Sequence, residues 1–570
     1  MLSDEKVQEI LKMLDISSKD SVDSDKYEKL DCLKEVKQYA DDLTVGETRQ
    51  AAEGLLHNLN SLQSRSGNQL PFSSINYGTC TLPEGQMVTK AILEASIDGV
   101  GKFHRTSIFP CGIFQYKKGV NDREGTPNYD LKRLALKSTS KRLYPNYANE
   151  DWSQQVAYVK ADRELKNKVI LNLSPEKYKA LKKLVSEDKD IAENLFLKVV
   201  DDKLVVNAEE SPIEIFSTMG CRTSNGADVN FTEEDYEDLI NKSLNRLDIS
   251  KLSLSKAQKD GRGNICPVTI IMPTVAMMVD GEIGNKSVDN FLELLDQKIG
   301  EAKDMLLERF EWICSQDSSS AKFMYENGTM SGYKPEEGIR SAMKHGTLAL
   351  GQLGLAETLQ ILIGKDHTTE DGMKLAKEIE GLFKKRCAEF KEKYNLNFGV
   401  YYTPAENLCY TAMTKFKERF GEIPNISDRD YFTNSMHVPV WKNMSPFDKI
   451  DIESQLVNYS NAGCITYVEV DGSTVNNIDA LEEIVDYAMA KDIPYFAVNV
   501  PSDTCLDCGY QGEFNDKCPE CGSTNLQQLR RVTGYLSQDY HQFNYGKQKE
   551  VEDRVDHVNK MTTLEGEDVR

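Results

Sequence analysis

The chain has 570 residues, of which 39% are hydrophobic and 28% charged, and its net charge is −22 at neutral pH. This composition predicts a soluble protein with a sizeable core. The negative charge argues against free nucleic acid as a ligand, because phosphate backbones are bound by excess Lys and Arg. No apolar run approaches 18 residues and the Met1 region lacks a signal-peptide pattern, so we expect a cytoplasmic protein that does not bind membranes.

Residues 1–50 are polar and predict a helical extension, and residues 51–500 predict a main α/β body. Two charged insertions interrupt this body, near 152–210 and 225–259. Helical spacing around 175–185 favours a solvated pair of charged helices in the first insertion, and we expect the second to be exposed in the same way.

Further along the chain, strand patterns alternate with helical patterns. Apolar, β-branched runs predict strands at 268–273, 464–472 and 493–501. Amphipathic spacing predicts helices over 288–310 and 372–394. Strands that alternate with helices indicate an α/β architecture.

A four-cysteine motif follows at residues 501–525. Cys505 and Cys508 form one C-x-x-C pair, and Cys518 and Cys521 form a second pair, with nine residues between the two pairs. A glycine follows each pair, as the tight turn of a metal knuckle requires. The spacing predicts a tetrahedral Zn²⁺ site, which should be structural because four thiolates leave no open position for a substrate.

The other cysteines of this chain are scattered, and we expect most of them to be small buried hydrophobic residues. The chain has 13 cysteines, and without a secretion signal they should be reduced thiols. Cys221 differs because small and flexible residues flank it in STMGCRTSNG, which is typical of a loop tip. An ordinary exposed thiol and a catalytic thiol are both compatible with this position.

Residues 526–570 contain an isolated glycine, Gly534, in the segment RRVTGYL. This segment, after a four-cysteine site, resembles the glycyl-radical loop of the anaerobic, class III ribonucleotide reductases. Nine further blocks resemble that family in the same order: NLNSLQSRSGNQLPFSSINYGT from Asn58, PEGQMV, IFPCGIF, PNYDLKRLA, MGCRT, DGRGNICPVTIIMP, HGTLALGQLGLAETL, TNSMHVPV and NAGCITYVEVDG.

The resemblance implies a ten-stranded α/β barrel of the glycyl-radical enzyme type, inside which the Cys221 loop and the Gly534 loop meet. It also implies anaerobic reduction of ribonucleoside triphosphates to 2′-deoxyribonucleoside triphosphates for DNA precursor synthesis. A radical-SAM activating protein with an iron–sulfur cluster would generate the glycyl radical at Gly534. That radical would then form a thiyl radical at Cys221. Met219, beside this cysteine, matches the subgroup that uses formate as reductant.

The resemblance further implies roles for four polar residues. Asn264 would hydrogen-bond near the substrate ribose, although a plain turn asparagine is an equal alternative. Glu357 is either a pocket carboxylate or a residue on a helix surface. Asn434 and His437 would bind substrate at the barrel rim, although a structural histidine is as compatible with the sequence. Arg530, Arg531 and Lys547 receive no role, because such a basic cluster can simply neutralise nearby carboxylates.

The N-terminal part departs from the family. Only about fifty polar residues precede the Asn58 block, and they contain no phosphate-binding motif. The family's segment for dimer contacts, effector binding and a partner cysteine is thus expected to be diverged or carried by a separate chain. A homodimer and ATP or dNTP effectors are implied by the resemblance alone. Two other functions stay open: another glycyl-radical enzyme of the formate-lyase or dehydratase type, and a non-catalytic zinc-ribbon protein or inactive fragment of a split reductase.

Overall fold

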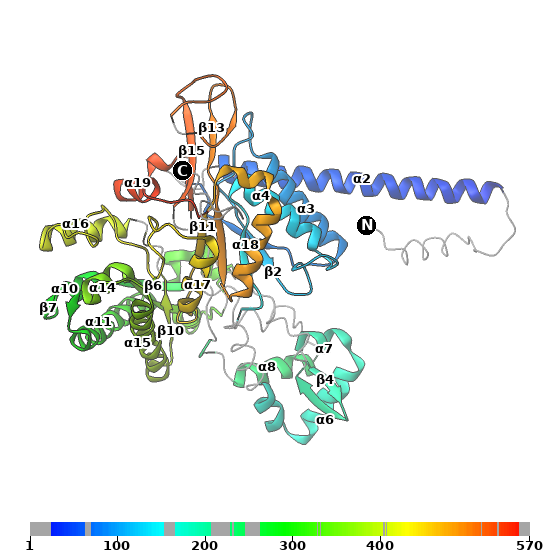
Figure 1. Ribbon diagram of the computed structural model, residues 1–570. Helices are drawn as coiled ribbons and strands as arrows, with labels where there is room; N and C mark the ends of the chain where they lie inside the picture. Colours follow the sequence, from blue (N-terminus) through cyan, green and yellow to red (C-terminus); the bar gives the residue numbers. More distant parts are fainter. Residues whose placement is uncertain are drawn as a thin grey trace.

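The computed structural model of the chain is mixed α/β (Figure 1). It describes residues 24–62, 70–152, 166–195, 197–206, 228–230, 233–245, 263–327, 329–330, 332–402, 405, 407–514, 516–532, 535–537 and 539–557.

A five-stranded sheet forms one half of the body. Its order is β1-β2-β3-β12-β11, in which β1, β2 and β3 are parallel, β12 and β11 are parallel, and β3 pairs with β12 in the antiparallel sense. The strands are β1 (Ser74–Tyr77), β2 (Cys111–Tyr116), β3 (Asn146–Asn149), β11 (Thr466–Glu469) and β12 (Tyr495–Asn499). Every residue of the last four is buried, as is usual for strands covered on both faces.

A three-stranded parallel sheet forms the second half, in the order β10-β9-β6. Its strands are β6 (Asn264–Ile271), β9 (Thr347–Leu353) and β10 (Asn397–Tyr401). Residues from both sheets belong to one hydrophobic core, for example Phe114 of β2 and Val400 of β10. The main-chain oxygen of Val400 also accepts hydrogen bonds from the main-chain N–H groups of Asn461 and Ala462, in the segment that leads to β11.

Helices of 6 to 27 residues form most of the rest of the body. They are α3 (Pro83–Asp98), α4 (Tyr129–Arg142), α10 (Met272–Met277), α11 (Val288–Cys314), α14 (Leu355–Ile363), α15 (Glu370–Tyr394), α16 (Leu408–Phe420), α17 (Pro446–Val457) and α18 (Ile478–Ala490). The predicted helices near 288–310 and 372–394 are confirmed by α11 and α15, and the three predicted strands by β6, β11 and β12. Helix α15 begins where the Thr369 side chain caps the N–H of Gly372.

The first insertion is a small unit with its own core. It contains α6 (Pro175–Glu187), α7 (Lys189–Leu195), β4 (Leu197–Val200) and β5 (Lys203–Val206), and α8 (Glu233–Leu244) packs on α6. The expectation of a solvated helix pair was wrong. An antiparallel hairpin is present, and apolar side chains such as Leu181, Leu197 and Tyr236 are buried together. Tyr236 lies in α8, so the second insertion contributes to this core and is not merely exposed.

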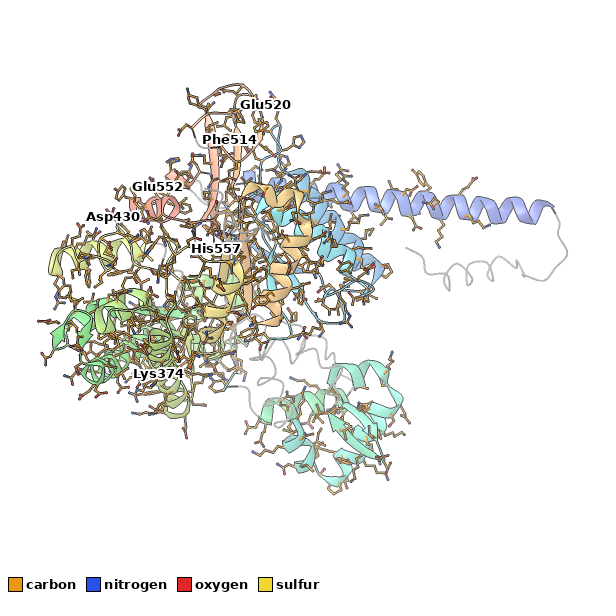
Figure 2. The ribbon with its side chains drawn as sticks, in the orientation of Figure 1. Lys374, Asp430, Phe514, Glu520, Glu552 and His557 are labelled. Carbon is orange, nitrogen blue, oxygen red and sulfur yellow. The ribbon has the colours of Figure 1, made fainter. Side chains whose placement is uncertain are left out.

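The C-terminal part forms a four-stranded antiparallel sheet in the order β14-β13-β15-β16. Its strands are β13 (Ser502–Cys505), β14 (Gln511–Gly512), β15 (Leu526–Val532) and β16 (Tyr535–Ser537), and α19 (Tyr545–Glu552) follows. Figure 2 shows Phe514 and Glu520 in the projecting part of this sheet and His557 near the centre of the molecule.

Helix α2 (Ser24–Ser61) extends away from the body (Figure 1) and is largely exposed over residues 34–51. The remaining elements are short: β7 (Gly281–Glu282), β8 (Asn285–Lys286), α12 (Lys322–Glu326), α13 (Arg340–Met343), and 3₁₀ turns at Ser318–Ala321, Gly472–Asn476 and Tyr540–Gln542. Among the described helices, none combines the length and the apolar character needed to cross a bilayer.

Candidate functional site

The four predicted metal ligands come together at the end of the C-terminal sheet. The sulfur atoms of Cys505, Cys508, Cys518 and Cys521 all lie within 4.8 Å of one another. The Sγ atoms of Cys505 and Cys521 are 3.6 Å apart, and those of Cys508 and Cys518 are 3.5 Å apart. Four sulfurs at about 2.3 Å from a tetrahedral Zn²⁺ are separated by roughly 3.8 Å. The geometry therefore fits a tetrathiolate metal centre.

The two halves of this cluster repeat the same main-chain hydrogen bonds. The N–H of Gly509 donates to the oxygen of Cys505, and the N–H of Gly522 donates to the oxygen of Cys518, each at 2.9 Å. Both glycines have positive φ, 81° and 72°, which glycine adopts without steric cost. The main-chain N–H of Cys508 is the largest of the influences that lower the pKa of Cys505. Each turn therefore directs its sulfurs toward the centre.

The strand that follows the cluster leads to the predicted radical position. β15 pairs with β13 through residues 526–529 and with β16 through residues 530–532. The last pair of the hairpin is Val532 with Tyr535. Thr533 and Gly534 stand between these residues and lie outside the described residues, as do Cys221 and Met219. The structure therefore places the strands on either side of Gly534 but neither of the two predicted radical residues.

Arg531 anchors this hairpin to the body. Its side chain is 1% exposed, donates to the main-chain oxygen of Leu143, and lies over the Tyr144 ring at 4.9 Å from the ring centre. The Tyr144 hydroxyl in turn contacts the Cys111 sulfur at 3.1 Å. A buried guanidinium needs such partners because an unpaired buried charge is costly. Arg531 thus anchors the hairpin through Nη2, while its buried Nε and Nη1 have no hydrogen-bond partner among the described residues.

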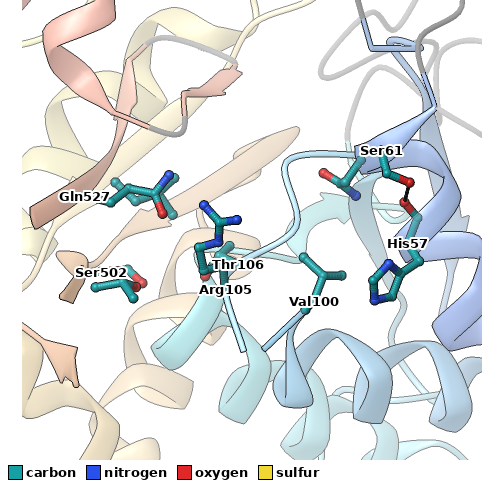
Figure 3. Close-up of a pocket in the computed structure, with 11 residues that line it drawn as sticks. His57, Ser61, Val100, Arg105, Thr106, Ser502 and Gln527 are labelled. Atoms are coloured by element: carbon teal, nitrogen blue, oxygen red, sulfur yellow. Dashed lines mark hydrogen bonds between the residues drawn. The ribbon is translucent and has the colours of Figure 1, made fainter. Parts of the chain in front are cut away.

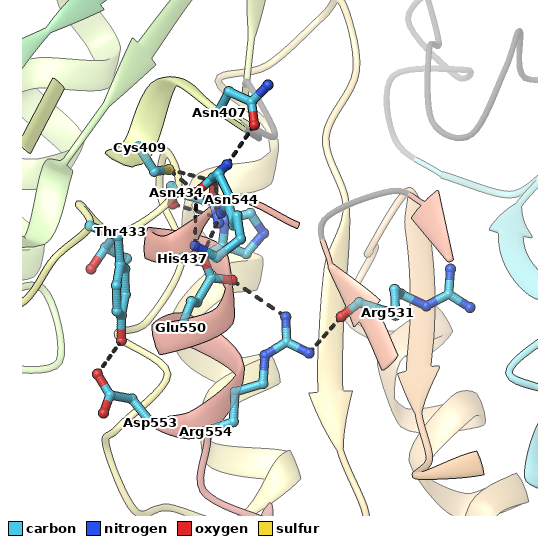
Figure 4. Close-up of polar contacts among 12 residues, drawn as sticks. Asn407, Cys409, Thr433, Asn434, His437, Arg531, Asn544, Glu550, Asp553 and Arg554 are labelled. Atoms are coloured by element: carbon cyan, nitrogen blue, oxygen red, sulfur yellow. Dashed lines mark hydrogen bonds and ion pairs between the residues drawn. The ribbon is translucent and has the colours of Figure 1, made fainter. Parts of the chain in front are cut away.

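A second anchor joins the hairpin to α19 and the residues after it (Figure 4). Arg554 donates to the main-chain oxygen of Arg531 at 2.6 Å and forms ion pairs with Glu550 at 3.3 Å and Glu469 at 3.5 Å. Glu550 also pairs with Lys547, and the side chains of both residues are 1% exposed. The cations Lys547 and Arg554 lower the pKa of the buried Glu550 carboxyl.

Lys547 connects this charged group to Asn434. Its ammonium lies 3.5 Å from the Asn434 side-chain oxygen and 3.7 Å from the Cys409 sulfur. The Cys409 thiol also donates to the same Asn434 oxygen, at 3.1 Å. Burial raises the pKa of Cys409 to about 12, so this thiol remains protonated as a donor. The Asn434 oxygen is therefore held by the C-terminal segment.

His437 is enclosed by main-chain oxygens. Its Nδ1 lies 2.9 Å from the oxygen of Asn434 and its Nε2 lies 2.7 Å from the oxygen of Ile465. Burial is the main cause of a lowered pKa at His437, which favours the neutral ring. A neutral imidazole has one N–H, so the ring donates to one of these two oxygens. Both ring nitrogens face the protein, which is the arrangement of a structural histidine.

Glu357 lies in the first turn of α14 and is 3% exposed, which excludes a surface position. Its Oε1 accepts hydrogen bonds from the Thr433 N–H at 2.8 Å and from the Thr433 hydroxyl at 2.7 Å. Its Oε2 is buried and has no partner among the described residues. Burial raises the pKa of Glu357 above its usual value. The carboxyl therefore has one oxygen fixed and one available.

Asn264 is the first residue of β6. Its amide donates to the main-chain oxygen of Ala462 at 2.8 Å. Its side-chain oxygen is buried and has no hydrogen-bond partner within the described part of the chain. A buried acceptor without a partner is uncommon and favours a role with a ligand. The unpartnered oxygen of Asn264 thus favours a ligand-binding role over that of a plain turn asparagine.

The loop 433–437 collects three of the predicted residues, because Asn434 and His437 belong to it and Glu357 binds Thr433. Asn264 contacts a different segment, and no described contact joins it to this loop. Lys547, Glu550 and Arg554 form a buried charged group that the sequence did not predict. A signal was present, since a cation, an anion and a cation spaced by three and four residues can face one another along a helix and the turn that continues it.

Comparisons with known proteins extend these observations. The family model for anaerobic ribonucleoside-triphosphate reductase matches residues 27–557. The anaerobic ribonucleoside-triphosphate reductase of Haemophilus influenzae is 30% identical over 92% of this chain and 64% of its own length. The enzymes of Escherichia coli and of phage T4 are each 29% identical, over 91% and 94% of this chain and 63% and 75% of their own lengths. The chain therefore spans a little under two thirds of the two bacterial relatives.

Solved structures agree in fold. A structure described as an anaerobic ribonucleotide reductase covers 92% of this chain and 70% of its own, with a TM-score of 0.59 at 17% identity. The Thermotoga maritima anaerobic ribonucleotide reductase in complex with dATP and CTP covers 87% and 67%, with a TM-score of 0.54 at 16% identity. The family match over most of the sequence and the four-cysteine cluster beside the Gly534 hairpin agree, and the chain belongs to the anaerobic ribonucleoside-triphosphate reductase family.

Proposed function

We propose that this chain carries the catalytic part of a reductase that converts ribonucleoside triphosphates to 2′-deoxyribonucleoside triphosphates for DNA precursor synthesis. Family membership over residues 27–557 supports this function. The observation that carries it furthest is that one strand, β15, joins the four-cysteine cluster to the residues that flank Gly534. A non-catalytic zinc-ribbon module has no need of such a hairpin anchored in the body of the protein.

The proposed chemistry begins at Gly534. An activating protein of the radical-SAM class removes a hydrogen atom from its α-carbon, and the stored radical later takes the hydrogen of the Cys221 thiol. The thiyl radical removes the 3′ hydrogen of the ribose, water leaves from C2′, and the intermediate receives two electrons and a proton. The Cys221 thiol then returns the hydrogen to C3′, which restores the thiyl radical. Formate is the proposed electron donor, oxidised to carbon dioxide, and Met219 beside Cys221 favours it. The protein contributes positioning and exclusion of water.

A closed ten-stranded barrel is the proposed setting for this chemistry. The five-stranded and three-stranded sheets supply eight strands around a shared core. The hydrogen bonds from residues 461 and 462 to Val400 support closure between β10 and β11.

Zn²⁺ is the proposed occupant of the four-cysteine cluster, and its sulfur spacing supports that choice. The four thiolates would fill its coordination positions, so the ion would supply structure and no chemistry. It would fix the start of β15 while the hairpin holds Gly534. Binding would be coupled to the folding of residues 505–521.

Roles for the polar residues follow from their contacts. We assign Asn264 to the ribose region, because its buried oxygen lacks a protein partner. Glu357 is the proposed pocket carboxylate, with Oε2 available. Substrate binding by Asn434 and His437 stays a prediction, and the contacts of both residues also support a role in positioning the 433–437 loop.

The proposed partners are the activating protein, with its iron–sulfur cluster, and a nucleoside triphosphate substrate. A homodimer in the cytoplasm is proposed from the family. ATP or dNTP effectors are proposed because the Thermotoga maritima relative was solved with dATP and CTP.

Electron paramagnetic resonance tests the central step. The zinc-loaded chain is incubated without oxygen with an activating protein, S-adenosylmethionine and a reductant. We expect a doublet from the α-hydrogen-coupled glycyl radical, and its loss in Gly534→Ala. Cys221→Ser should keep the doublet and lose nucleotide reduction, because the radical is stored before the thiol acts. Absence of any signal with an activating protein that is competent on another reductase would refute the proposal.

A further inference from the structure

A pocket of about 160 Å³ lies where three distant parts of the chain meet. The end of α2 contributes His57, the turn between residues 100 and 106 contributes Arg105 and Thr106, and the C-terminal sheet contributes Ser502 of β13 and Gln527 of β15. Figure 3 draws Arg105 between the side formed by Ser502 and Gln527 and the side formed by His57. None of these residues belongs to the four-cysteine cluster or to the proposed active site.

The charge of this pocket is opposite to that of the protein. The chain carries 91 acidic and 69 basic residues, yet no Asp or Glu lines the pocket. Arg105 is half-buried, and its guanidinium makes no hydrogen bond or ion pair within the described ranges. A guanidinium is always charged and offers five donors. A cation of this kind without an anionic partner in a strongly acidic protein indicates a place for an external anion.

Further unused donors surround Arg105. The Thr106 hydroxyl is buried and has no hydrogen-bond partner in the described structure. The side-chain amide of Gln527 and the ring of His57 also lack a partner among the described residues. The donors approach the cavity from α2, from the turn and from β15. Donors on several sides suit a tetrahedral oxyanion, whose oxygens point to different sides. They suit a planar carboxylate, which has two oxygens in one plane, less well.

The walls of the pocket are fixed before any ligand binds. Val100 and Arg105 exchange two main-chain hydrogen bonds, at 2.8 and 3.0 Å. Gln511 donates to the main-chain oxygens of Phe103 and His104 at 2.8 and 2.7 Å, which ties the turn to the C-terminal sheet. The Asn60 side chain accepts from the N–H of Ile108 at 2.7 Å, which ties α2 to the same segment. A fixed main chain reduces the entropy lost when the side chains of the pocket bind a ligand.

We propose that this pocket binds a phosphate group, with Arg105 as its charged ligand and Gln527, Thr106 and His57 as additional donors. The group is either free phosphate or the phosphoryl end of a nucleotide. Its binding joins α2 to β15, the strand that continues toward Gly534. The site does not depend on the proposed reductase activity, because it requires only the described residues.

Isothermal titration calorimetry with inorganic phosphate, in chloride buffer on the zinc-loaded full chain, tests the site. We expect saturable binding to one site per chain. Arg105→Ala should weaken it by about tenfold or more, the usual effect of losing a hydrogen bond to a charged group. Arg105→Lys should give an intermediate affinity, because lysine keeps the positive charge but lacks the planar, paired N–H donors of the guanidinium. Gln527→Ala, on a different segment, should also weaken binding.

Lys102→Ala is the matched control, because Lys102 belongs to the same turn, lies outside the lining and is exposed. Its phosphate affinity should equal that of the unaltered chain. A parallel titration with ATP shows whether the bound phosphate group belongs to a nucleotide or is free phosphate. An ATP affinity that falls together with that for phosphate in Arg105→Ala indicates a nucleotide, and an unchanged ATP affinity indicates free phosphate. Undetectable phosphate binding, or equal binding by folded Arg105→Ala, Arg105→Lys and unaltered chains, would overturn the proposal.

Discussion

Arg554 donates a hydrogen bond of 2.6 Å to the main-chain oxygen of Arg531, three residues before Gly534. Arg531 itself is buried against Tyr144 and Leu143. The hairpin is therefore held at two points. The Arg531 side chain contacts Leu143 and Tyr144, and the Arg531 main chain is bound by Arg554. The position of β15, the strand before Gly534, thus depends on a residue that comes later in the sequence.

Replacement of Arg554 by Ala should destabilise the protein strongly. The substitution removes the ion-pair partner of Glu469, which keeps only its hydrogen bond from Asn499, and one of the two partners of Glu550. It therefore leaves buried carboxylates less compensated. Breaking a buried ion pair costs about 3–5 kcal/mol. Urea unfolding should show a loss of that order, and hydrogen exchange should show faster exchange of amides in β15 and β16.

Lys549→Ala is the control for this change, since the Lys549–Glu552 pair lies on the same helix but is exposed. Exposed pairs contribute at most about 1 kcal/mol. If Lys549→Ala and Arg554→Ala unfold at the same urea concentration, the tail does not anchor the hairpin.

Removal of one thiolate should release the metal. We expect one zinc per chain by mass spectrometry, and loss of most of it in Cys508→Ser, because a tetrahedral site needs all four ligands. Cys80→Ser should retain full zinc, as Cys80 is exposed and stands apart from the cluster. Equal zinc content in the two variants would show that the metal lies elsewhere.

Glu380 should make stability depend on pH. Burial raises the pKa of this carboxyl to about 8, and Gln352 donates to it at 2.7 Å. Between about pH 5 and pH 8 the folded chain keeps a proton that the unfolded chain has lost, so the free energy of unfolding falls as pH rises. Relative to Glu380→Gln, the unaltered chain should lose about 1 kcal/mol per pH unit in this window, by urea unfolding.

Glu378→Gln serves as the comparison for that experiment, because Glu378 is exposed on the same helix. It should follow the pH dependence of the unaltered chain. A Glu380→Gln variant that shows the same slope as Glu378→Gln would mean that Glu380 is ionised in the folded protein.

Thiol reactivity should distinguish the exposed cysteine Cys80 from the buried cysteines Cys387 and Cys409. Burial raises the pKa values of Cys387 and Cys409 to about 12, and the thiolate is the reactive form. Iodoacetamide at pH 8 should therefore modify exposed Cys80 in the native protein, while Cys387 and Cys409 react only after unfolding. Peptide mass spectrometry measures each site. Rapid native modification of Cys409 would contradict its enclosure by Lys547 and Asn434.

Local patterns explain what could be predicted. The four-cysteine cluster is defined by two short motifs with a glycine each, and the strand β6 and the helix α15 follow from hydrophobic periodicity within one element. The hairpin of the inserted unit also has a sequence signal, because Asp201 and Asp202 stand as a two-residue turn between segments rich in Leu and Val, at 197–200 and 203–206. Both residues have positive φ, 48° and 64°, as such a turn requires.

Contacts between distant segments could not be predicted in this way. Lys547 meets Asn434 across 113 residues of sequence, and Gln511 meets the turn at residues 103 and 104 across about four hundred. No periodicity within either segment specifies its partner. The family resemblance supplied candidate roles for Glu357 and Asn264, whereas the unpartnered oxygens that support those roles appear only in three dimensions.

The division of β15 has a mechanical consequence. Its pairs with β13 involve residues 526–529 and its pairs with β16 involve residues 530–532. The second set can therefore open while the first set and the metal ligands remain in place. Local opening of a few pairs requires far less free energy than global unfolding. The pairs of β15 with β16 can thus separate without disturbing the pairs with β13 that lie next to the four-cysteine cluster.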